Sequence, residues 1–198
     1  MPLTQVTPPQ SEPITVAEVR HQIRQGDSVD DGYIGSVLIP AARERFEKAT
    51  GRSAITQTWD YVLDGFPSCD YIEIPKSPLQ SVTYVRYIDT GGTTQTMTVT
   101  TDYLVQAPSG PRAARGRVYL PFSETWPTTL EQIGAVTIRF VCGYGSTPDS
   151  VPALLRQAML VDAAHLYAHR EDFSTEPTSW VRRVYFDHRD YPVQRVAA

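Results

Sequence analysis

The stretch VTIRFVCGYGSTPDSVPALLRQAMLVDAAHLYAHR, residues 136–170, decides the fold. Apolar and polar residues alternate from Val136 to Cys142, which is the pattern of a strand with one buried face. After Gly143-Tyr144-Gly145 the period changes, and from Val151 to about Arg170 apolar residues recur at helical spacing. The stretch therefore predicts a strand that leaves a sheet through a glycine turn and then enters a long helix.

The strand period extends upstream of this stretch to residue 53. Gly91-Gly92 has the composition of a hairpin turn, and residues 107–116 form a longer, exposed loop that carries arginines. These features predict a mostly antiparallel sheet or small sandwich. Its further strands are ITQTWDYVL (55–63), YIEIP (71–75), SVTYVRYID (81–89), TQTMTVT (94–100), DYLVQ (102–106) and GRVYLP (116–121).

Two helices are expected before the strands. Thr15 and Glu18 have capping-box spacing and open a short helix that ends by Gly26. A second helix runs from about residue 30 to Gly51, which is a C-terminal cap. Pro40 lies inside it and removes a backbone hydrogen bond, so a kink near residue 37 is expected.

Helices at both ends with strands between them predict an α+β protein. We expect an antiparallel helical bundle, built from N- and C-terminal helices, that carries an inserted antiparallel β-sheet or sandwich domain. The expected parts are an extended N-terminal arm (1–14), the bundle (15–52 and 146–171), the β domain (53–145) and a C-terminal tail with a short helix and an extended end (172–198).

Composition limits the function classes. The formal net charge is −4, with 22 acidic and 18 basic residues, and no basic block indicates duplex binding through phosphate neutralisation. Cys69 and Cys142 are expected to be isolated thiols in a reducing cytoplasm. The sequence predicts no secretory signal, no membrane span and no cofactor.

Catalytic and metal patterns are weak. Gly143-Tyr144-Gly145 lacks the lysine and Ser/Thr of a phosphate loop, so we interpret it as a turn. His165 and His169 are four residues apart, with Asp162 one turn earlier, a spacing that can hold a metal. We expect instead that Asp162 and His165 hydrogen-bond along the helix while His169 interacts with the helix C-terminus. No catalytic, cofactor or metal residues are predicted, and the chain is expected not to be an enzyme.

The C-terminal tail has the composition of an interface. The arm and the tail show too little buried periodicity to pack on their own chain, yet the tail is rich in aromatic residues and arginines, which anchor many interfaces. The alternative is a tail that packs back on its own bundle. The candidate contact residues are Trp180, Arg182, Arg183, Tyr185, Phe186, Arg189 and Tyr191, with Arg112, Arg115 and Arg117 of the long loop as weaker candidates.

Taken together, these segments resemble the head–tail connector (adaptor) proteins of long-tailed bacteriophages and phage-like particles, including gene transfer agents. The resemblance covers residues 8–171, and Pro40 and the tail after Asp172 depart from it. It rests on PPQSEPITVAEVRHQIR (8–24), AARERFEKATGR (41–52) with TQTW (56–59), PLQSV (78–82) and GYG…VPALLRQA (143–158).

The resemblance implies a non-enzymatic virion protein that forms a ring, expected to be twelvefold, below the portal protein. Such a ring extends the channel for double-stranded DNA and contacts the next neck protein, a head-closure (stopper) or tail component. The tail residues named above would then bind the portal, and the chain would lie in the host cytoplasm during assembly and afterwards in the virion neck. A mildly acidic subunit suits a channel through which DNA slides without sequence specificity.

Another structural protein of the neck or tail is an alternative to the connector, and two other function classes stay open from the sequence. One is a β module on a helical base that binds a receptor or a glycan. The other is a small metal-dependent hydrolase that uses Asp162, His165 and His169. From the expectation of a loosely tethered tail, we also predict that a chain truncated after Asp172 folds but does not bind the portal.

Overall fold

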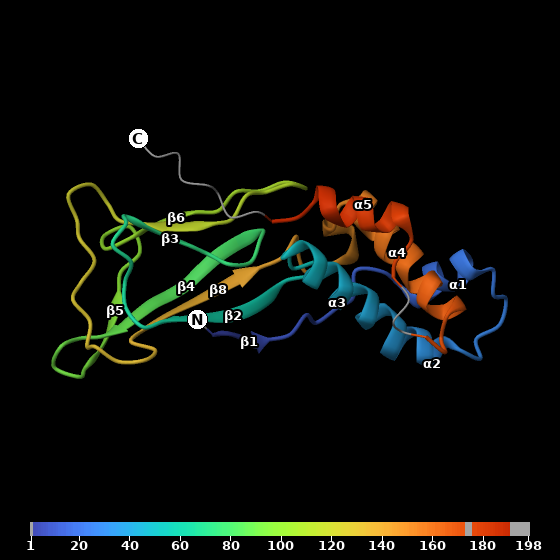
Figure 1. The fold of residues 1–198 in the computed structure, drawn as a ribbon, viewed down its shortest axis with the longest axis horizontal. Coiled ribbons are helices and arrows are strands. Elements are labelled where there is room, and N and C mark those ends of the chain that lie inside the picture. The colour runs from blue at the N-terminus through green and yellow to red at the C-terminus, as the bar shows by residue number, and fades with distance from the viewer. Residues whose placement is uncertain (1, 173–175, 191–198) are drawn as a thin grey trace. The chain divides into compact units, whose positions relative to one another are not determined.

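The computed structural model describes residues 2–172 and 176–190. The chain divides into a β unit, from residues 1–8 and 56–143, and a helical unit, from residues 9–55 and 144–190. The β unit therefore interrupts the sequence of the helical unit, and the two are described separately below (Figure 1).

The β unit contains two antiparallel sheets. The larger has the order β1-β2-β8-β4-β5, and Figure 1 shows β2, β8 and β4 side by side at its centre. The smaller has the order β3-β7-β6. The strands are β1 (Leu3–Thr7), β2 (Gln57–Leu63), β3 (Tyr71–Glu73), β4 (Leu79–Ile88), β5 (Thr94–Met97), β6 (Leu104–Gln106), β7 (Arg117–Tyr119) and β8 (Val136–Cys142).

One apolar core lies within the β unit and takes residues from both sheets. Strand β8 shows why: Val136, Ile138, Phe140 and Cys142 are buried while the residues between them are not, as the period of two requires. The smaller sheet adds residues of β3 and β7 to the same core. All seven predicted strands after residue 53 are confirmed, and so is the hairpin at Gly91-Gly92 between β4 and β5.

The helical unit is built mainly from α1, α3, α4 and α5. Its apolar core contains residues from each of them, including Val19, Phe46, Met159 and Val184. The helices are α1 (Val16–Ile23), α2 (Asp31–Tyr33), α3 (Ile39–Thr50), α4 (Ala153–Ala168) and α5 (Ser179–Asp187), with a π-helical segment (Ile34–Leu38) between α2 and α3 and a 3-10 turn (Pro148–Ser150) before α4.

The predicted helix caps are confirmed. The Thr15 side chain accepts a hydrogen bond from Glu18 N, and the Glu18 carboxylate accepts one from Thr15 N. Gly51 caps α3 with a φ of 74°, a left-handed conformation that glycine adopts without a steric penalty. The predicted second helix is divided into three parts: α2, the π-helical segment and α3. Pro40 lies in the first turn of α3, where a missing backbone donor is tolerated.

Two predictions about the chain ends are wrong. The N-terminal arm is not separate from the fold, since β1 pairs antiparallel with β2. The tail is not loosely tethered over residues 176–190, since α5 packs into the helical core through Val181, Val184 and Tyr185. These three side chains form an apolar stripe at helical spacing, and burying it stabilises α5 on its own chain.

The glycine turn connects the two units along the chain. Gly143 N donates to Pro78 O within the β unit, and Tyr144 N donates to Ala54 O within the helical unit. Gly143 has a φ of 128°, which favours glycine at this position. Both cysteines are free thiols, as predicted. None of the helices in the described part of the chain combines the length and apolar character that a membrane crossing requires.

Candidate functional site

Helix α5 has three different faces, and the predicted contact residues are distributed over all three. Val181, Val184, Tyr185 and His188 are buried and form the face toward the core. Arg182, Phe186 and Arg189 follow one another at spacings of four and three residues, so they share a second face. Trp180 and Arg183 lie on the third face and are exposed.

Tyr185 is therefore a packing residue. Its side chain is 3% exposed, its ring packs edge-on against Phe46 with centroids 5.5 Å apart, and its hydroxyl donates to Asp162 Oδ2 at 3.4 Å. Burial and the neighbouring Asp162 carboxylate raise the pKa of Tyr185 well above its ordinary value. Tyr191 lies outside the described residues.

Asp162 is fully buried in α4, and its charge has only partial compensation. Its Oδ1 lies 3.4 Å from an Arg45 guanidinium nitrogen. Burial raises the pKa of Asp162 to about 6, although Arg45 and the Tyr185 hydroxyl act in the opposite direction. The predicted hydrogen bond between Asp162 and His165 is wrong, because Arg45 on α3 and Tyr185 on α5 approach the carboxylate instead.

The two histidines of α4 lie together at its C-terminal end, where their ring centroids are 4.3 Å apart. His169 Nδ1 is 2.9 Å from His165 O, so its expected role at the helix end is confirmed. Burial, His169 and Arg45 lower the pKa of His165. Within residues 2–172 and 176–190, no three His, Cys, Asp or Glu side chains are placed to hold one metal ion.

A groove of about 560 Å³ lies between the last turns of α3 and helix α5. Ala49, Pro177, Tyr185 and Phe186 supply its apolar surface. Among the described residues, the charged side chains that line it are Arg45, Lys48, Arg182, Arg189 and Glu176.

Two of the groove's cations form ion pairs, and two have no carboxylate partner among residues 2–172 and 176–190. Arg45 pairs with Asp162, and Arg182 pairs with Glu176. Arg189 Nε donates to the carbonyl of Ala49 at 3.0 Å, and its guanidinium lies 5.8 Å from the Phe186 ring centroid. No carboxylate of the described residues lies within ion-pair distance of Lys48 or Arg189. As far as the described residues form it, the groove is an apolar surface with an excess of positive charge, which is suited to an acidic group next to an apolar one.

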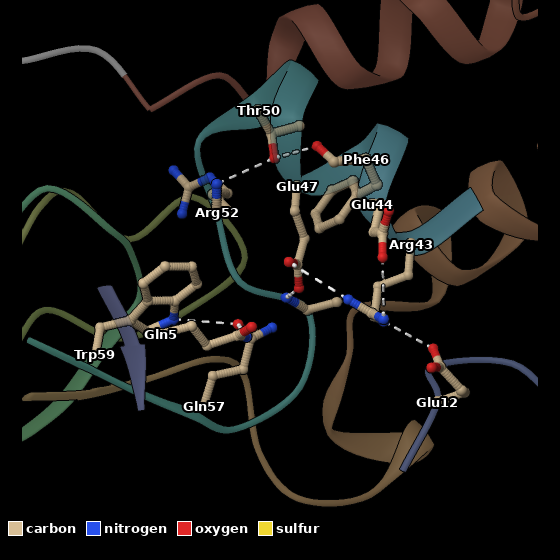
Figure 2. A network of polar contacts seen from close by, with 11 residues as sticks. Gln5, Glu12, Arg43, Glu44, Phe46, Glu47, Thr50, Arg52, Gln57 and Trp59 are labelled. Atoms are coloured by element: carbon tan, nitrogen blue, oxygen red, sulfur yellow. Dashed lines mark hydrogen bonds and ion pairs between the residues drawn. The ribbon is translucent and has the colours of Figure 1, made fainter. Parts of the chain in front are cut away.

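Buried polar contacts keep α3 in place within the helical unit (Figure 2). Arg43 donates to Glu12 at 2.8 Å and lies 3.7 Å from Glu47 on the next turn. Glu47 Oε1 accepts from the backbone nitrogen of Ala54 at 3.0 Å, and Arg52 Nε donates to His188 O at 2.6 Å. These contacts join α3 to the segment before α1 and to the segment that follows α3, and they join that following segment to the end of α5.

Figure 2 also shows a polar contact that belongs to the β unit alone. Gln57 Oε1 accepts from Gln5 Nε2 at 2.8 Å and from Trp59 Nε1 at 3.1 Å. The bond to Gln5 joins β1 to β2 by side chains as well as by the backbone.

The weaker candidates of the long loop are mostly engaged within the β unit. Arg115 lies 3.6 Å and Arg117 3.9 Å from the Glu73 carboxylate, and Arg117 also donates to the Tyr119 hydroxyl at 2.8 Å. Arg112 is exposed. The sequence did not indicate the groove, because Arg45, Lys48 and Ala49 belong to α3 and meet α5 only through folding.

No protein-family model matches the sequence, and a search of the curated proteins finds no match to it. Solved structures do match. A chain in the neck of an empty GTA particle, computed with C6 symmetry, is 24% identical, with a TM-score of 0.80 over 98% of both chains. A chain in the virion of a native gene transfer agent (GTA) particle is 25% identical, with a TM-score of 0.79 and the same coverage.

A third similar chain comes from the neck of a native GTA particle computed with C12 symmetry. It is 21% identical and has a TM-score of 0.72, again over 98% of both chains. The chain therefore shares its fold, over nearly its whole length, with chains of gene transfer agent particles.

Proposed function

We propose that this chain is a structural virion protein of a phage-like neck, and more specifically a head–tail connector (adaptor). The observation that carries the proposal is the fold match, with a TM-score of 0.80 over 98% of both chains, to a chain of a GTA particle neck. The residue order that resembles connector proteins supports the finer assignment. The residues whose spacing could hold a metal also support a structural role. Asp162 pairs with Arg45 inside the helical unit, and His169 contacts the carbonyl of His165 at the end of α4.

The chain acts as one subunit of a closed ring, and the proposed ring is twelvefold. A similar chain belongs to a neck computed with C12 symmetry and another to a neck computed with C6 symmetry. When one surface of each subunit binds a different surface of its neighbour, repetition around an axis closes into a ring if a whole number of rotation steps makes a full turn. The ring joins the capsid's portal to the next neck or tail component, and the chain passes from the host cytoplasm into the virion during assembly.

The portal contact is proposed for the outward face of α5, where Trp180 and Arg183 lie. Trp180 is 42% exposed, and tryptophan and arginine are enriched among residues that dominate binding energies. Arg182, Phe186 and Arg189 line the groove instead, and Tyr185 lies in the core. The prediction that truncation after Asp172 leaves a folded chain is withdrawn, because it removes α5 from the helical core.

Double-stranded DNA passes through the ring in this proposal. A net charge of −4 supports passage without tight binding, since affinity for DNA comes largely from neutralised phosphates. Rings with neutralised lumen carboxylates should retain more DNA, and unchanged retention would contradict this part of the proposal.

Point variants of α5 test the portal contact without removing the helix. Trp180→Ala with Arg183→Glu should abolish co-purification with the portal, while circular dichroism shows a folded chain. The matched control is Asp187→Asn, an exposed change on the same face of α5. Portal binding at the wild-type level by the double variant would refute the assignment of this face.

The ring itself is tested by electron microscopy of the neck of particles assembled with the chain. We expect a closed ring of this subunit beside the portal. Particles without the chain, or with single unassembled copies, would overturn the proposed function.

A further inference from the structure

We propose that copies of this chain join head to tail by inserting the turn at Phe122 of one copy into the groove between α3 and α5 of the next. This inference rests on the proposed ring. It names the two surfaces that meet at each contact of that ring. One surface has an exposed aromatic side chain beside a carboxylate, and the other is an apolar groove lined by cations.

The inserted element is the turn Pro121–Glu124 of the β unit, in which Glu124 N donates to Pro121 O at 3.2 Å. Ser123 has a φ of 63°, an unusual conformation for a residue with a side chain. Phe122 at the tip is 99% exposed. A phenylalanine held fully in water forgoes its burial energy, and it regains that energy when its ring packs on an apolar surface of another copy.

The residues on both sides of the turn are held by contacts within the β unit. Trp126 stacks on Phe66 with centroids 4.8 Å apart and an angle of 3° between the rings. Trp126 Nε1 donates to Cys69 O at 2.8 Å, and Leu120 N donates to Asp70 O at 2.8 Å. A preorganised segment loses little conformational entropy when it binds.

The turn is acidic where the groove is basic. Glu124 and Asp102 line the same hollow of the β unit, and none of the described residues that line it is a cation. The groove has two cations, Lys48 and Arg189, without a carboxylate partner in the described part of the chain. Phe122 on the apolar surface beside Phe186, with Glu124 near Lys48, would satisfy both the apolar and the charged parts of the groove.

The geometry of a ring agrees with this pairing. The turn and the groove are two different surfaces, so their contact is heterologous: it leaves the groove free on the copy that inserts its turn and the turn free on the copy that receives it. Repetition then adds copies in one direction, as a closed ring requires.

Disulfide trapping in assembled particles tests the contact. One chain carries Glu124→Cys and a second carries Lys48→Cys, both with Cys69→Ser, so only different copies can form the new disulfide. We expect cross-linked dimers from particles assembled with the mixture. Ile133→Cys replaces Glu124→Cys in the matched control, because Ile133 lies in the same β7–β8 segment and is 90% exposed, and it should give no cross-link.

Incorporation of variants into necks gives an independent measure. Phe122→Ala should lower incorporation at least about tenfold, as for a residue that dominates a contact, while Ile133→Ala should not. Glu124→Lys should also lower incorporation, and the double variant Glu124→Lys with Lys48→Glu should recover it.

The outcomes distinguish a failure of this contact from a failure of the proposed function. Necks that contain the chain, yet show no 124–48 cross-link and tolerate Phe122→Ala, would refute the contact and leave the proposed function in place. A cross-link to the 133 control that is as strong as that to 124 would also refute it. Particles without the wild-type chain would overturn the proposed function, and this contact with it.

Discussion

Replacing Asp162 with Asn should change how the stability of the helical unit depends on pH. The pKa of this carboxyl is about 6 in the folded chain, against an ordinary value of 3.8. Between these values the folded state binds a proton that the unfolded state has lost. The contribution of Asp162 to stability therefore falls as the pH rises from 3.8 to about 6, and it stays at its lower level above that.

The magnitude follows from the difference between the two pKa values. At about 1.36 kcal/mol per pKa unit, the charged carboxylate makes the folded state about 3 kcal/mol less stable at neutral pH than a carboxyl with an ordinary pKa. Asn has a similar shape and cannot ionise, so the variant should gain stability relative to the wild type between about pH 4 and pH 7.5. Part of this gain is offset because Arg45 loses its ion pair, and we expect a change in relative stability of about 2 kcal/mol.

The assay is urea unfolding at about pH 4 and at about pH 7.5, followed through the signal of Trp180. Fluorine-labelled tryptophan separates Trp180 from Trp59 and Trp126 of the β unit, so the helical unit is measured by itself. Asp187→Asn, on the exposed surface of α5, controls for the loss of one negative charge. Parallel pH profiles of the wild type and Asp162→Asn would refute the reasoning, because they would show that Asp162 has the same pKa in the folded and unfolded states.

Three further changes test the packing of the two units. Thr15→Ala should lower the free energy of unfolding of the helical unit by about 1 kcal/mol, because α1 loses its cap, and Thr15→Ser should retain it; urea unfolding compares the two. Phe46→Ala should cost about 3–5 kcal/mol by leaving a cavity in a fully buried position, and a loss in urea below about 1 kcal/mol would contradict this. Gly116→Ala should destabilise the β unit in thermal unfolding, because the added Cβ would lie 2.5 Å from Leu79 Cβ, a buried atom that cannot move freely. An unchanged melting temperature for Gly116→Ala would show that this part of the β unit can rearrange.

Local signals in the sequence were sufficient for most of the secondary structure. Helix α1 begins where the side chain of Thr15 caps the backbone of Glu18, and α3 ends where Gly51 adopts a left-handed φ. Each of these interactions lies within one helical turn, so it can be predicted without knowledge of the fold. The alternation in β8 was equally informative, because one face of the strand packs in a core.

The tail shows how local composition misled. Trp180, Arg182, Arg183 and Phe186 suggested a surface segment, but Val181 and its neighbours one turn later form a buried stripe. Thr178, whose side chain accepts from Val181 N, marks the start of that helix. The sequence predicted a short helix in the tail, and α5 confirms it. The spacing of Val181, Val184 and Tyr185 was the signal that could have shown that this helix packs into the core.

The sequence by itself predicted which segments are helices or strands, that the chain is of the α+β class, and that a β domain expected at residues 53–145 interrupts the helices. Only the tertiary structure decided which residues of α5 face the core, which line the groove and which remain on the surface. It also decided that Arg45 and Tyr185 meet Asp162, and that Lys48 and Arg189 line one groove. The physical reason is the range of the interactions along the chain. Caps and periodicity act within a turn or two, whereas the groove and the buried charge depend on contacts between different helices, such as Arg45 with Asp162 and Arg189 with Ala49.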